Sequence, residues 1–229
     1  SLGFDRYEVS VSTHNEGTVR NLARGLRIAK GQFVKQISPG DGLYSSTALS
    51  NIAAFCTSHA VKVGFGELVS YTLAENGTFF QSYNAPLNPE QYSEHQNLES
   101  IQKDLLVHAN WIPGCALFYD RVFFLAYLEI LSSKYAVTYC EDLACPLIAL
   151  DNEMIRYFPH PILWYEMGTG VSTTGGIASR KRMYGDHRRF FDTLKHLHPN
   201  HHVVSRAWSL FRLREFVALR TPVYPIAQT

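Results

Sequence analysis

The feature that most constrains the fold is an alternation of strand-like and helix-like segments along most of the chain. Residues 7–12 alternate apolar and polar side chains, as a strand does, and residues 18–29 carry apolar side chains at helical spacing. Further strands are predicted at 32–37, 61–66, 68–73, 136–139, 154–158 and 162–165, and further helices at 46–58, 95–108, 121–132, 141–151, 185–197 and 202–220. Strands that alternate with helices favour an α/β fold, in which crossover helices pack on a sheet.

Composition sets the class of protein. The chain has 229 residues, of which 46% are hydrophobic and 18% charged, so it can bury a core and is not intrinsically disordered. Lysine and arginine number 21 against 20 acidic residues, which excludes a strong general attraction to nucleic acid. Basic residues become denser in the C-terminal third, where they fit either a solvated helix face or a contact with anionic lipid or pyrophosphate.

Cysteine spacing and hydropathy indicate the cellular compartment of such a protein. None of the four cysteines forms a CxxC pair, which argues against a zinc ribbon and favours reduced core residues. No signal peptide opens the sequence, and no apolar run is long enough to span a bilayer. We therefore expect a cytoplasmic protein, and a peripheral association with the inner face of the membrane is compatible with the sequence.

Four motifs occur in a characteristic order. The first is a run that leads into the predicted strand at 32–37 and the turn Ser38-Pro39-Gly40-Asp41; it comprises Asn15-x-Gly17, Arg20-Asn21, Gly25-Leu26 and Ala29-x-Gly31-x-Phe33-Val34. The others are Trp111-Ile112-Pro113-Gly114-Cys115-Ala116, then Glu141-Asp142, then the run from Trp164 to Ser172. In this order the motifs resemble the central and acceptor-side segments of family 2 glycosyltransferases with the GT-A fold, of the type that builds bacterial surface polysaccharides.

The resemblance implies a fold and an activity. The fold would be a GT-A, nucleotide-diphospho-sugar transferase-like sandwich with a mixed, mostly parallel sheet flanked by helices. Residues 1–175 would form this domain, and residues 176–229 would form a helical extension packed on it. The activity would be inverting transfer of a sugar from a nucleotide-diphospho sugar, UDP-linked by expectation, to a glycan acceptor.

The resemblance also assigns roles to individual residues. Asp142 would be the general base, because an attacking hydroxyl must lose its proton, and Glu141 would orient that base. Asp41 would help to hold Mg²⁺ or Mn²⁺ and the diphosphate, since these ions prefer oxygen ligands. The donor-side contacts would be Asn15, Arg20 and Asn21. The contacts to the rest of the substrate would be Trp111, Gly114, Tyr165, Thr169 and Ser172.

Each acidic motif also has an ordinary structural explanation. Pro-Gly-Asp-Gly is a turn sequence for backbone reasons alone, and the family's first metal-binding aspartate is replaced here by Ser38 or Pro39. Glu141-Asp142 could be an acidic helix N-terminus that the helix dipole favours. A catalytically impaired, glycosyltransferase-like binding or assembly module is therefore the alternative to an enzyme.

The N-terminal strands of the family have no counterpart before Tyr7. Residues 7–12 match the family's third strand better than its first, so the domain would be truncated at its nucleotide-binding side. An exposed sheet edge tends to pair with another strand. We therefore expect either a homo-oligomer or a missing N-terminal segment.

Overall fold

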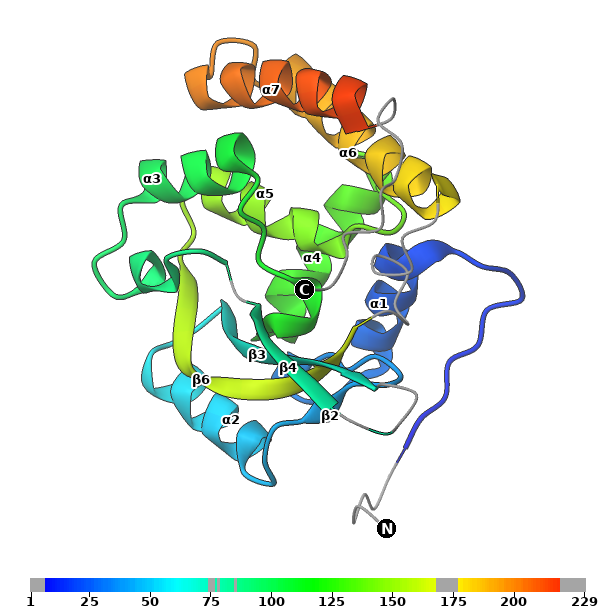
Figure 1. The fold of residues 1–229 in the computed structure, drawn as a ribbon, viewed down its shortest axis with the longest axis vertical. Helices are drawn as coiled ribbons and strands as arrows, with labels where there is room; N and C mark the ends of the chain where they lie inside the picture. Colours follow the sequence, from blue (N-terminus) through cyan, green and yellow to red (C-terminus); the bar gives the residue numbers. More distant parts are fainter. Residues whose placement is uncertain (1–6, 74–76, 78, 85, 168–176, 219–229) are drawn as a thin grey trace.

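The protein is described by a computed structural model that covers residues 7–73, 77, 79–84, 86–167 and 177–218. A twisted sheet occupies the lower half of the view in Figure 1, and helices lie on both of its sides. The α/β class with a mixed sheet flanked by helices is thereby confirmed.

Within the described residues the sheet has six strands, in the order β1-β5-β3-β6-β2, with β4 beside β3. Their bounds are β1 (Phe33–Lys35), β2 (Gly42–Leu43), β3 (Val63–Leu73), β4 (Phe79–Asn84), β5 (Leu117–Asp120) and β6 (Ile155–Glu166). β3 and β6 pair in parallel, and the other four pairings are antiparallel. The expectation of a mostly parallel sheet is therefore wrong. Short strands such as β1, β2 and β5 can join a sheet in the antiparallel sense without a crossover helix.

The long strand β3 organises the sheet. Its first residues pair with β5, its last residues pair with β4, and β6 follows its other side throughout. The register shifts around Glu67, where the β3–β6 ladder bulges. Two glycines allow the close packing at this point: a Cβ on Gly64 would lie 2.5 Å from the Phe118 ring, and one on Gly66 would lie 2.7 Å from Ile162.

The segment between β1 and β2 crosses from one edge of the sheet to the other, because β1 pairs with β5 and β2 pairs with β6. Its turn reaches Gly40, whose φ of +92° is a left-handed conformation that glycine adopts readily. The Tyr71 hydroxyl on β3 donates to the Gly40 carbonyl at 2.7 Å. This crossing places Ser38 to Asp41 over the end of the central strands.

Helices cover the two faces of the sheet. α1 (Gly17–Ile28) packs on α4 (Arg121–Ser133), whereas α2 (Ala48–Ser58) lies below the sheet in Figure 1. Asp120 begins α4 as its N-cap, because its Oδ1 accepts from the amides of Val122 and Phe123 at 3.0 Å. α3 (Leu98–Gln102) continues as a wider π turn, Lys103–His108, and α5 (Ala144–Leu150) packs behind it.

Two long helices complete the described chain. α6 (Ile177–Leu197) and α7 (His202–Ala218) pack on each other, and α7 also packs on the turn Lys103–His108. Phe190, Phe191 and Leu194 of α6 are buried in the same core as the residues of the sheet. None of the helices in the described residues is long and apolar enough to cross a membrane.

Several predicted strands differ from the structure. The strands predicted at 61–66 and 68–73 form the single strand β3, and those at 154–158 and 162–165 form β6. Residues 7–12 pair with no strand among the described residues, and Tyr7, Val9 and Val11 are exposed. Residues 136–139 are not a strand either, because the amides of Thr138 and Tyr139 donate to a side chain of α6, as described below.

Candidate active-site cleft

A cleft of about 310 Å³ opens over the end of the sheet. Its lining comes from six separate parts of the chain, namely the start of α1, the crossing segment between β1 and β2, the turn before β5, the segment that leads into α5, the end of β6, and α6. The residues are Thr18, Gln36, Ser38, Pro39, Asp41, Pro113, Gly114, Cys115, Tyr139, Cys140, Glu141, Asp142, Tyr165, Glu166 and Met183. Residues from all four sequence motifs therefore line one cleft.

Asp41 is held at one wall of the cleft by its backbone and by β6. Its Oδ1 accepts from the Glu166 amide at 3.2 Å, and its own amide donates to the Ser38 carbonyl at 3.1 Å. Its Oδ2 is buried and has no hydrogen-bond partner among the described residues. Burial raises the pKa of Asp41 above its usual range, and the nearby Glu166 carboxylate adds to this, while backbone hydrogen bonds oppose it.

Glu141 and Asp142 form another wall of the cleft, in the short 3₁₀ turn Glu141–Leu143 that leads into α5. Glu141 Oε1 accepts from Gln36 Nε2 at 3.1 Å, and Gln36 Oε1 accepts from the Tyr119 hydroxyl at 3.2 Å. The Glu141 carboxylate lies over Gly114, where a Cβ would come within 2.3 Å of its Oε1. Only glycine leaves room for the carboxylate at this position.

Burial raises the pKa of both carboxyls in this turn above their usual range. The charge of Asp142 raises the pKa of Glu141 further, and the charge of Asp186 raises that of Asp142. A carboxylate with a raised pKa is a stronger base than one in water, and a cleft that holds two of them can exchange protons near neutral pH.

The backbone just before Glu141 is held by a side chain from α6. Asp186 is fully buried, and its Oδ2 accepts from the amides of Thr138, Tyr139 and Cys140 at 3.1, 2.6 and 3.1 Å. Its Oδ1 pairs with the Arg189 guanidinium. One carboxylate thus satisfies three consecutive amides that no strand ladder binds. Asp186 thereby fixes the path of the chain into the acidic turn.

A half-buried lysine links two walls of the cleft. The Lys35 ammonium donates to the Gln36 carbonyl at 2.9 Å and also to the Cys115 carbonyl. Burial lowers the pKa of Lys35 to about 8, while the neighbouring Asp41 charge acts in the opposite direction. The ammonium therefore ties the crossing segment to the turn Gly114–Ala116 and provides positive charge near Asp41.

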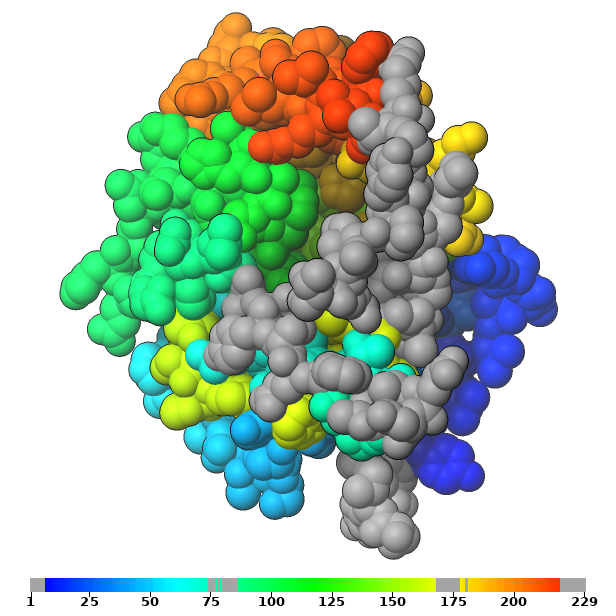
Figure 2. All heavy atoms as spheres, in the orientation of Figure 1, coloured from blue at the N-terminus to red at the C-terminus, as the bar shows by residue number. Residues whose placement is uncertain are grey.

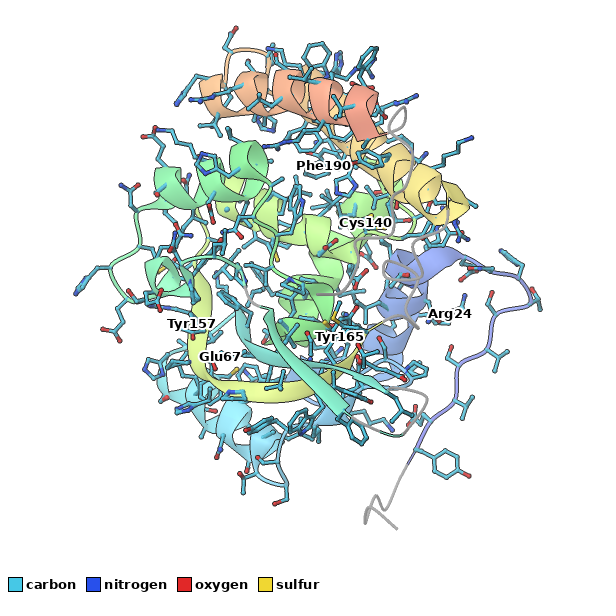
Figure 3. All side chains as sticks on the ribbon, viewed as in Figure 1. Arg24, Glu67, Cys140, Tyr157, Tyr165 and Phe190 are labelled. Atoms are coloured by element: carbon cyan, nitrogen blue, oxygen red, sulfur yellow. The ribbon has the colours of Figure 1, made fainter. Side chains whose placement is uncertain are left out.

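The cleft gathers five of the residues that the sequence singled out, namely Asp41, Gly114, Glu141, Asp142 and Tyr165. Figure 3 labels Tyr165 near the end of β6 and Cys140 below α6, close to the centre of the molecule. Thr169 and Ser172 lie outside the described residues.

The remaining four residues lie outside the cleft. Asn15 Oδ1 accepts from the Gly17 amide at 2.9 Å at the start of α1, and Asn21 is exposed on α1. Arg20 Nε donates to Ser132 Oγ at 3.0 Å. Trp111 packs edge-on against His187, with 5.5 Å between the ring centroids. The structure therefore does not bring these four side chains to the cleft.

Arg20 lines a second cavity instead, of about 430 Å³, between α1 and α4. Figure 3 labels its neighbour Arg24, whose guanidinium pairs with Glu16. Arg27 pairs with Glu129 on α4 at 2.8 Å. The charges of this cavity are thus largely neutralised by pairs within the chain.

The acidic residues of the cleft are the candidate ligands for a metal ion. Among the described residues, no group of three or more His, Cys, Asp or Glu side chains is arranged to hold a metal ion. Asp41 and Glu166 nevertheless offer two carboxylates at one wall, and one Asp41 oxygen is buried without a partner. Mg²⁺ is commonly bound by one or two carboxylates together with substrate phosphates, so this pair fits such an ion.

Sequence reasoning missed four residues that shape the cleft: Lys35, Gln36, Glu166 and Asp186. Lys35 and Gln36 are consecutive polar residues between the apolar Val34 and Ile37 of the predicted strand, and this break in its apolar pattern could have identified them. Asp186 lies in a basic stretch about 45 residues after Glu141, so its contact depends on tertiary structure.

No protein-family model and no curated protein matches the chain. Two solved structures of S. aureus TarS are similar to it. The structure of TarS 1–349 has a TM-score of 0.46 and 14% identity over 96% of this chain and 57% of that one. The structure titled simply S. aureus TarS has a TM-score of 0.47 and 15% identity over 96% of this chain and 35% of that one. The chain thus spans well under two thirds of each, and similarity at this level assigns neither a family nor an activity.

Proposed function

We propose that the chain catalyses inverting transfer of a sugar from a nucleotide-diphospho sugar, UDP-linked in the first instance, to a glycan acceptor of a bacterial surface polysaccharide. The observation that carries the proposal is the meeting of Asp41 with Glu141 and Asp142 in one cleft, although 100 residues separate them in the sequence. Sugar transfer needs a site for the diphosphate and a base for the acceptor, and the two acidic walls match these needs.

Asp142 is the base in this proposal. The acceptor hydroxyl gives its proton to the Asp142 carboxylate while its oxygen bonds to the anomeric carbon. The bond from that carbon to the diphosphate breaks in the same step, and the nucleoside diphosphate leaves with the electron pair. Burial raises the pKa of Asp142, which suits it to accept a proton at neutral pH.

Glu141 and Gln36 act as positioning residues. The Gln36 amide fixes one oxygen of Glu141, and Tyr119 fixes Gln36 in turn. This network holds the acidic turn against the wall that carries Asp41. Gly114 and Tyr165 supply the remaining surface on which the acceptor would rest.

Asp41 and Glu166 are the residues that would hold Mg²⁺ or Mn²⁺. When bound, such an ion neutralises the charge that develops on the leaving diphosphate. Lys35 adds a fixed positive charge below Asp41, which opposes the mutual repulsion of the two carboxylates.

The test is a transfer and donor-hydrolysis assay with a panel of nucleotide sugars and Mn²⁺. Asp142→Asn should lower turnover by about 10² to 10⁴, the usual contribution of a general base, and leave the thermal shift with UDP and Mn²⁺ unchanged. Glu153→Gln, at a surface carboxylate paired with Lys62 outside the cleft, is the matched control and should keep full activity. Unchanged turnover in Asp142→Asn would remove this residue from the role.

A binding or assembly module is the second candidate. It is favoured by Ser38 or Pro39, which stands where the resembled family has its first metal-binding aspartate, and by the absence of a three-ligand metal group among the described residues. If no nucleotide sugar is turned over and neither UDP nor UDP with Mn²⁺ raises the melting temperature, the module is the better description.

A further inference from the structure

The helical hairpin of α6 and α7 carries a charge unlike that of the rest of the chain. Residues 177–218 contain nine lysines and arginines against three acidic residues, a formal charge of +6, whereas the whole chain carries +1. Two of the three acids, Asp186 and Glu215, are buried and paired with arginines. The third, Asp192, accepts from the Trp208 indole at 2.7 Å. The solvent-facing surface of the hairpin is therefore strongly cationic.

The outer face of α7 is also apolar. Leu213 is 60% exposed, Phe216 56% and Val217 48%. Residues three and four positions apart are neighbours on a helix, so Phe216 and Val217 extend the surface begun by Leu213. The opposite face of α7 carries Val203, Val204, Ala207 and Phe211, which are buried in the core. The helix therefore shows apolar side chains on two faces, of which one faces the solvent.

Exposed arginines surround this apolar surface. Arg212 and Arg214 flank Leu213 on either side, and Arg206 lies two turns earlier on the same face. Figure 2 shows α7 along the upper edge of the molecule, away from the sheet. The acidic side chain nearest the start of this helix is Glu99, which pairs with Lys103 and His202. Arg212 pairs with Glu215 at 3.8 Å, whereas Arg206 and Arg214 face the solvent and pair with no acidic side chain among the described residues.

We propose that the outer face of α7, with the adjoining cationic surface of α6, docks on the headgroups of an anionic bilayer. Apolar side chains that lie between arginines on a surface helix match an interface in which the apolar groups enter the acyl boundary and the guanidinium groups meet phosphates. The arginines alone would attract any polyanion, but the exposed apolar side chains on the outer face of α7 favour a lipid surface. α6 also supplies Met183 to the cleft, so this docking would hold the cleft close to the bilayer.

The experiment is co-sedimentation of the full chain with two kinds of vesicle, one of phosphatidylcholine alone and one that also contains phosphatidylglycerol. We expect binding to the anionic vesicles only, and weaker binding as salt is added. Arg206→Glu combined with Arg214→Glu should weaken partitioning by at least about thirtyfold, because each basic residue near an anionic surface contributes about 1 kcal/mol and 1.4 kcal/mol is a factor of ten. Leu213→Ser should weaken binding without removing its dependence on lipid charge.

The matched control is Lys30→Glu combined with Lys134→Glu, which changes the net charge equally at two exposed lysines away from α7. This variant should bind anionic vesicles nearly as well as the unchanged chain, and melting curves check that all variants fold. The proposal is overturned if the unchanged chain does not sediment with anionic vesicles, if both double variants lose binding equally, or if duplex DNA competes fully with the vesicles.

Discussion

Removing the Asp186 carboxylate tests whether the helical hairpin holds the acidic turn of the cleft. In Asp186→Ala the amides of residues 138–140 lose their acceptor and Arg189 loses its partner. Three charge-assisted hydrogen bonds at about 1.5–3 kcal/mol each would give an upper bound near 9 kcal/mol. Water can reach part of this loop once the side chain is gone, so the cost of breaking a buried charged pair, about 3–5 kcal/mol, is the better guide.

The assay is urea unfolding followed by circular dichroism, together with melting curves. A loss of about 3–5 kcal/mol lowers the melting temperature of a domain of this size by roughly 6–20 °C. Asp186→Asn keeps one carbonyl acceptor and should lose about half as much as Asp186→Ala. Asp192→Ala is the control on the same helix, since Asp192 is exposed and makes one bond to Trp208, and it should cost less than about 1 kcal/mol.

Amide hydrogen exchange separates the local from the global effect. Residues 138–140 should exchange faster in Asp186→Asn than in the unchanged chain, even under conditions where the rest of the domain stays protected. The reasoning is refuted if Asp186→Ala loses no more stability than Asp192→Ala, or if exchange at these three amides is unaffected.

Two further predictions concern the cleft and the sheet. Burial raises the pKa of Glu141, so folding favours its protonated form, and its contribution to stability is present below the ordinary carboxyl pKa and lost as the pH rises through the raised value. Glu141→Gln should therefore melt at a higher temperature than the unchanged chain at pH about 8, and the difference in melting temperature should shrink toward pH about 4. A difference independent of pH would contradict this. Gly64→Ala should lower the free energy of unfolding by about 1–3 kcal/mol, measured in urea, because a Cβ there would lie 2.5 Å from Phe118. Gly25→Ala, in α1 with no atom within 4 Å of the new Cβ, should instead raise it by about 0.5–1 kcal/mol. Equal effects of the two changes would remove the packing explanation.

The sequence by itself determined the class of fold and most of its elements. Apolar periodicity located α1, α2, α4 and the two C-terminal helices, because the core face of a helix repeats at a spacing that neighbouring residues alone reveal. The motifs at Asp41, Gly114 and Glu141 were likewise readable, since turn and acidic residues interrupt apolar segments there. Their meeting in one cleft was decided by the tertiary structure, because Gly114 precedes β5 and Glu141 follows a segment that is not a strand.

Tertiary structure alone decided how the strands pair and which polar groups position the site. Whether β5 runs with or against β1 depends on contacts between residues about 85 positions apart, and local propensity does not encode such a direction. Residues 136–139 have the pattern of a strand, yet they join no strand ladder. The amides of Thr138 and Tyr139 donate to the buried Asp186 carboxylate, and the Val137 amide donates to the Leu131 carbonyl. Arg20 likewise points to α4 instead of the cleft because the packing of α1 against α4 fixes which of its side chains face that helix. A sequence specifies which side chains must be buried or paired, and the tertiary structure determines which groups they pair with.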